Sequence, residues 1–162
     1  MQLSTLPDHS RVWVFQADRI LTEEEVNLIQ QELAYFIPQW AAHGQDLYGA
    51  YEVRENLFIV IAVDEQKAPA SGCSIDALTR VIKDLGARLK VDFFNRLCLS
   101  FEREPGQIEL MSMEAFKSEI ATGQINMDTI VFNNLVRNKE ELDENWRTEA
   151  RNSWHTNLFS LV

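Results

Sequence analysis

The residues best suited to chemistry lie in one short segment, Ala70-Ser71-Gly72-Cys73-Ser74-Ile75-Asp76. Cys73 is one of only two cysteines, and it directly precedes an amphipathic pattern that predicts a helix. Unpaired N–H groups and aligned dipoles at a helix N-terminus favour negative charge, so they can lower the pKa of a thiol or hold an anion. The segment therefore predicts either a thiolate nucleophile or an anion-binding site.

His43 is the residue that we expect beside Cys73. It lies in Trp40-Ala41-Ala42-His43-Gly44, just after the first predicted helix. In the strand order predicted below, the loop with His43 and the loop before Cys73 leave the sheet at the same end. A cysteine next to an imidazole can become a thiolate nucleophile, so Cys73 and His43 are the candidate catalytic residues. His155 is an alternative base.

A noncatalytic role for the same segment is the simpler interpretation. Small residues permit a tight turn, Ser71 or Ser74 can cap the helix, and Cys73 can pack as a small apolar residue. The negative charge of Asp76 would oppose formation of a thiolate. A binding site here would hold a small anion or the carboxylate of a partner, with the downstream amides orienting it. Its candidate ligand-binding residues are Ser71, Gly72, Cys73, Ser74, His43, Asn133 and Asn134.

The spacing of apolar residues predicts the elements that must position these side chains. Runs rich in β-branched and aromatic residues predict strands, and apolar residues at helical spacing behind capping residues predict helices. Pro38 should end the first helix, and Glu55-Asn56 should form a tight hairpin turn. The predicted order is strand 11–16, helix 23–36, strand 47–54, strand 57–63, helix 75–89, strand 96–102 and short strand 108–111.

This order is the βαββαβ arrangement of ferredoxin-like folds. We therefore predict an α+β protein with a ferredoxin-like antiparallel sheet core at residues 1–111. Leu57 to Val63 contains no polar residue, which is typical of a strand covered on both faces. Residues 112–162 predict a C-terminal α/β extension of helix, strand and helix, with Asn138 as the cap of the last helix. We expect this extension to cover the second face of the sheet in a single compact unit.

The composition argues against several classes of function. The chain has 162 residues and a net charge of −10, and its 15 Lys and Arg residues are scattered, so nucleic acid and anionic membranes are unfavourable partners. The first residues lack the pattern of a secretory signal, and no apolar run could span a bilayer, so we expect a cytoplasmic protein. Two cysteines and three histidines do not have the spacing of a metal site. No metal or other cofactor is predicted.

Four segments of the chain resemble a family of small uncharacterised bacterial proteins that are often labelled ABC transporter ATPases. That label implies ATP hydrolysis, but none of the six glycines is followed by Lys, so the phosphate-binding loop G-x-x-x-x-G-K-[ST] is missing. We therefore predict no ATP turnover. The segments that carry the resemblance are Trp40-Ala41-Ala42-His43-Gly44, Ser71-Gly72-Cys73-Ser74-Ile75-Asp76, Thr129-Ile130-Val131-Phe132-Asn133-Asn134-Leu135 and Ser153-Trp154-His155.

Taken together, the sequence favours a noncatalytic domain that binds a small anion or a protein partner at the N-terminus of the helix starting near Ser74. The alternative is a thiol-dependent enzyme or redox sensor that uses Cys73 with His43 or His155. A third hypothesis is a structural protein whose exposed sheet face forms a homodimer.

Overall fold

The first sheet consists of β1 (Arg11–Gln16), β4 (Gly49–Arg54) and β5 (Phe58–Val63) in the computed structural model, which describes all residues from Met1 to Val162. The strand order is β1-β5-β4, and both outer strands run antiparallel to β5. All six residues of β5 are buried, as its uninterrupted apolar sequence predicts. Three residues, Glu55, Asn56 and Leu57, join β4 to β5, because Arg54 pairs with Phe58. Glu55 and Asn56 have left-handed backbone angles, and the N–H of Leu57 donates to the carbonyl of Arg54 at 3.0 Å, so the predicted tight turn forms here.

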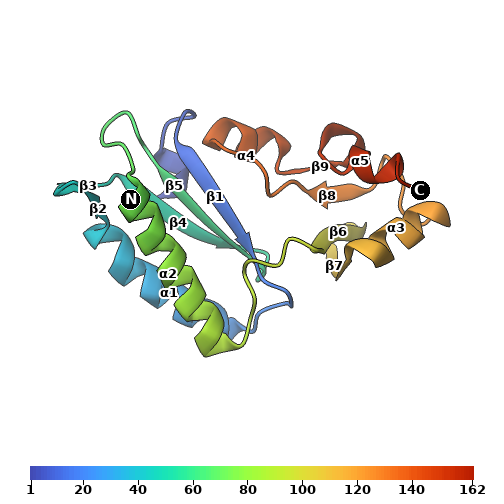
Figure 1. Ribbon diagram of the computed structural model, residues 1–162, viewed down its shortest axis with the longest axis horizontal. Helices are drawn as coiled ribbons and strands as arrows, with labels where there is room; N and C mark the ends of the chain where they lie inside the picture. The colour runs from blue at the N-terminus through green and yellow to red at the C-terminus, as the bar shows by residue number, and fades with distance from the viewer.

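Helices α1 (Glu23–Phe36) and α2 (Gly72–Leu89) cover one face of this sheet (Figure 1). α1 begins with a capping box in which Thr22 and Glu25 each bond to the backbone of the other, and it ends before Pro38 as predicted. The chain then forms the 3-10 helix η2 (Ile37–Gln39) and a short hairpin of β2 (Ala41–Ala42) and β3 (Gln45–Asp46), which the sequence did not predict.

The other face of the first sheet is covered by residues from the C-terminal third, as expected. The ring of Phe58 lies 5.0 Å from that of Phe132 and 4.9 Å from that of Trp146. Val136 and Leu142 join the same core, the latter from α4 (Lys139–Asn145). The predicted cap of α4 is confirmed, because the side chain of its N-cap residue accepts a hydrogen bond from the third residue of the helix. The 3-10 helix η1 (Leu3–Thr5) also contributes to this core.

The α+β class is confirmed, but the fourth strand of the predicted ferredoxin-like sheet does not belong to the first sheet. β6 (Cys98–Glu104) does not pair with β1. It lies in a separate antiparallel sheet of order β7-β6-β8-β9, with β7 (Gln107–Ser112), β8 (Ile130–Phe132) and β9 (Arg147–Glu149). The predicted turn at Pro105-Gly106 lets β7 pair with β6 locally, so the hairpin from residues 98–112 shares its sheet with residues that we expected to form an extension.

A second, smaller core explains this pairing. Leu99 and Phe101 of β6 pack with Phe116 of α3 (Met113–Ala121) rather than against the first sheet. The 3-10 helix η3 (Ala150–Asn152) and helix α5 (Thr156–Phe159) complete this part of the molecule, which lies beside the first sheet (Figure 1). The apolar side chains of residues 98–102 are therefore buried in the second core.

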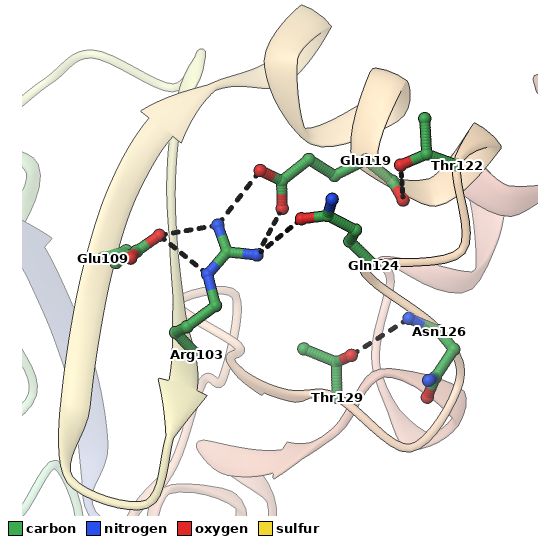
Figure 2. A network of polar contacts seen from close by, with 7 residues as sticks. All are labelled: Arg103, Glu109, Glu119, Thr122, Gln124, Asn126 and Thr129. Atoms are coloured by element: carbon green, nitrogen blue, oxygen red, sulfur yellow. Dashed lines mark hydrogen bonds and ion pairs between the residues drawn. The ribbon is translucent and has the colours of Figure 1, made fainter.

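One arginine joins the β6–β7 hairpin to α3. The guanidinium of Arg103 donates to Glu109 of β7 at 2.7 and 3.1 Å and to both carboxylate oxygens of Glu119 at 2.7 and 3.0 Å (Figure 2). The same group reaches Gln124 beyond the helix at 3.4 Å. Such two-pronged pairing fixes orientation as well as distance.

None of the helices combines the length and apolar character needed to cross a membrane.

Candidate functional site

The N-terminus of α2, where the sequence predicts a site, uses its hydroxyl groups for capping. Ser71 Oγ accepts a hydrogen bond from the N–H of Ser74 at 3.1 Å, and Ser74 Oγ accepts one from the N–H of Ser71 at 2.8 Å. Ser74 Oγ also donates to the carbonyl of Ser71. Gly72 and Cys73 are the first two residues of the helix, and both are exposed. The predicted serine cap is thus confirmed.

His43 lies in the turn between β2 and β3, where its side chain is exposed and its backbone is left-handed. This hairpin is attached to the start of α2, because the indole N–H of Trp40 donates to the carbonyl of Ser74 at 2.8 Å. The loops that carry His43 and Cys73 therefore meet at one end of the sheet. The two side chains form no hydrogen bond with each other, and no ionic partner is present for either.

The other two groups of candidate residues lie elsewhere. His155 directly precedes α5. This helix lies away from α1 and α2 (Figure 1). Asn133 forms a local turn, since its side-chain oxygen accepts from the N–H of Leu135 at 3.1 Å. Asn134 bridges the two sheets. The residues selected from the sequence therefore do not converge on one site, but Asn134 and His155 both line one cavity.

This cavity, which we call the intersheet cavity, has a volume of about 590 Å³ and lies between β1 and the second sheet. Ligand pockets for small molecules have this size. Its apolar lining residues are Val14, Phe15, Phe93, Phe94, Leu99, Met113, Phe132, Leu135 and Trp154. Its polar lining residues are Gln16, Asn95, Arg96, Ser100, Asn134 and His155.

Three of the polar residues form a network that joins the two sheets. The side-chain oxygen of Gln16 accepts from Ser100 Oγ at 2.7 Å and from the amide of Asn134 at 3.0 Å. The amide nitrogen of Gln16 donates to the carbonyl of Cys98 at 3.1 Å. The side-chain oxygen of Asn134 accepts from the indole N–H of Trp146 at 3.0 Å. Because these groups satisfy one another, the network serves to hold the cavity wall in place.

His155 is the polar residue in the wall that is not satisfied. Its side chain is nearly inaccessible, with the residue 1% exposed, and its ring stacks on Trp154 with centroids 4.1 Å apart. Burial lowers its pKa to about 4, so the imidazole is neutral at pH 7. Nδ1 lies 2.5 Å from Ser153 Oγ, but Nε2 has no hydrogen-bond partner.

The unpaired Nε2 keeps a small accessible surface. Ser10 Oγ is the only fully buried side-chain nitrogen or oxygen without a partner, so the surface that His155 keeps includes Nε2. His155 is also one of the residues that line the intersheet cavity. A neutral imidazole can donate or accept one hydrogen bond there, depending on its tautomer.

Sequence reasoning missed Gln16, Ser100 and Arg96 as site residues. Apolar and polar residues alternate over residues 96–102, with Leu97 on the apolar side and Ser100 on the polar side. Ser100 is nevertheless only 2% exposed, whereas Leu97 is 62% exposed. The hydroxyl of Ser100 is buried because it donates to Gln16, which lies 84 positions away in the chain. No local signal in the sequence could have revealed this pair.

Comparison with models of protein families, with curated protein sequences and with solved structures finds no match to this chain. No group of three His, Cys, Asp or Glu side chains is arranged to hold a metal ion. The chemistry of the intersheet cavity therefore has to be read from its own residues.

Proposed function

We propose that this chain is a noncatalytic binding protein whose ligand, a small and largely apolar molecule, occupies the intersheet cavity. The observation that carries the proposal is the unpaired Nε2 of buried His155. No protein group hydrogen-bonds to this nitrogen, whereas buried polar groups are normally paired. A ligand with one suitably placed polar group would pair with Nε2 while its apolar part covers the aromatic residues of the lining.

The chemistry of His155 favours binding over catalysis. An imidazole with a pKa of about 4 is a weak base at pH 7, because efficient general bases have a pKa near the working pH. Ser153 and His155 resemble a nucleophile and its base, but no carboxylate hydrogen-bonds to the ring to orient it. Ser153 is also absent from the cavity lining.

The thiol-dependent alternative draws little support from the surroundings of Cys73. Its side chain is exposed at the start of α2, and no imidazole hydrogen-bonds to it. Cys73 is also absent from the lining of the intersheet cavity. A Cys73→Ser variant is therefore expected to bind ligand as the unmodified protein does.

The test uses N-phenyl-1-naphthylamine, a neutral aromatic probe that fluoresces in apolar surroundings, titrated at pH 7. We expect saturable binding at one site. Met113→Trp, which adds volume to a residue of the cavity lining, should weaken this binding about tenfold or more. Met111→Trp is the matched control, because Met111 is half-buried on β7 outside the cavity, and it should bind as before. Absence of saturable binding, or equal affinity in both variants, would overturn the proposal.

A further inference from the structure

We infer that the ligand of the intersheet cavity is a hydrophobic monocarboxylic acid whose carboxylate is held by Arg96. This inference rests on the proposed function and names its ligand class. Arg96 is the only charged residue in the cavity lining, and it is exposed, which puts it at the mouth.

The guanidinium of Arg96 has no carboxylate partner within the protein. Seven of the ten arginines form ion pairs, and the chain carries 25 acidic residues against 15 basic ones. An unpaired cation at the mouth of an otherwise uncharged cavity is therefore unusual for this chain. Electrostatic complementarity favours an anionic group on the ligand at this point.

The neighbouring residue adds a second donor. The side-chain oxygen of Asn95 accepts from the N–H of Leu97 at 3.0 Å, so its amide N–H groups are left to donate. The guanidinium of Arg96 and the free amide N–H groups of Asn95 both act as donors, and a planar guanidinium suits a carboxylate. No acidic side chain lines the cavity to repel one.

The interior of the cavity limits the rest of the ligand. Phe15 packs against Phe94 with ring centroids 5.7 Å apart, and Trp154 stacks on His155, so the wall is mainly aromatic. The amide network of Gln16 is already satisfied, so the buried part of the lining keeps Nε2 of His155 as a polar atom without a protein partner. Because His155 is neutral, the lining supplies a single positive charge, which matches a monoanion better than a phosphate dianion.

The experiment compares acids with their neutral amides by isothermal titration at pH 7. The probes are indole-3-acetate and octanoate, against indole-3-acetamide and octanamide. We expect each acid to bind about tenfold or more tightly than its amide, as a charge-assisted hydrogen bond would give. Arg96→Gln should bring the affinity of the acid down to that of the amide and leave the amide unchanged. Arg80→Gln, which removes another exposed arginine without an ion pair, should keep the preference for the acid.

The possible outcomes separate the two proposals. If acids and amides bind equally and Arg96→Gln changes neither, the ligand class is wrong while binding in the cavity stands. If no acid or amide binds and N-phenyl-1-naphthylamine also fails to bind, both proposals are overturned. Binding of the neutral probe without any acid would overturn the carboxylic acid alone.

Discussion

Ser153 Oγ lies 2.5 Å from Nδ1 of His155 and also accepts the backbone N–H of that histidine at 3.2 Å. These two contacts fix the orientation of the imidazole between the rings of Trp154 and Phe116. One ring nitrogen is therefore paired within the protein, whereas no protein group hydrogen-bonds to the other. Burial of the ring also makes His155 resist protonation, because it lowers the pKa of the imidazole.

The first prediction concerns pH. The unfolded chain binds a proton on His155 below its usual pKa of 6.5, whereas the folded protein does so only near pH 4. The unfolded state thus holds more protons in this window, and the free energy of unfolding should fall as pH drops from about 6.5 to about 4. The free energy of unfolding should fall by about 3 kcal/mol in total over this window. None of this loss is expected at pH 7 and above.

Urea denaturation between pH 7 and 4.5 measures this loss. His155→Gln removes the titrating group and should flatten the curve. His43→Asn is the control, because it removes an exposed imidazole and keeps a residue that tolerates the left-handed backbone of that turn. A wild-type curve that is parallel to that of His155→Gln would contradict the prediction.

The second prediction concerns Gly86 in the last turn of α2. Alanine normally stabilises a helix interior by about 1 kcal/mol relative to glycine. Here an added Cβ would lie 2.6 Å from the carbonyl oxygen of Val91, a backbone atom that cannot easily move aside. We therefore expect Gly86→Ala to lower the free energy of unfolding by about 1–3 kcal/mol.

Gly72→Ala, in the first turn of the same helix, is the matched substitution, since no atom lies within 4 Å of its added Cβ. It should leave stability unchanged or slightly raised in the same urea titration. Equal effects of the two substitutions would mean that the contact with Val91 is not tight.

The third prediction concerns Arg103. Lysine cannot reproduce its paired contacts with Glu109 and Glu119, so Arg103→Lys should measurably lower the free energy of unfolding. Arg151→Lys, at more exposed ion pairs with Glu149 and Asp128, should lower the free energy of unfolding by less than about 0.5 kcal/mol. Thermal denaturation at pH 7 distinguishes them. Similar losses in both variants would contradict a special role for the network.

The same network predicts an acid dependence. The guanidinium of Arg103 lowers the pKa of Glu119 below its usual 4.5. The contribution of Glu119 is therefore present above pH 4.5 and is lost as pH falls through its lowered pKa. In Arg103→Lys this acid-dependent loss should be smaller, which denaturation at pH 5 and pH 3 would reveal.

The fourth prediction concerns the two thiols. Cys73 is exposed, whereas Cys98 is half-buried and burial raises its pKa. Because the thiolate is the reactive form, iodoacetamide at pH 8 should label Cys73 at least about tenfold faster than Cys98 in the native protein. Peptide mass spectrometry follows both rates, and unfolding in guanidinium should abolish the difference. Faster labelling of Cys98 in the native protein would show that its environment is more open than described.

Local elements could be predicted from the sequence because the interactions that define them join residues close together in the chain. The cap of Thr22 with Glu25 and that of Asn138 with Glu141 each span three residues. The turn at Glu55-Asn56 likewise depends on two adjacent left-handed residues. Chain neighbours and apolar spacing therefore determined the helices, most strands and the α+β class.

The tertiary structure alone decided which strands pair and where a cavity forms. β6 joined β8 in a second sheet because Leu99 and Phe101 found a separate core, which alternation along the strand does not specify. The wall of the cavity depends on Gln16 meeting Ser100 and Asn134 across the chain. Contacts between distant segments depend on packing of the whole molecule, so the sequence indicated a site at the start of α2 while the structure brought Asn134 and His155 to the intersheet cavity.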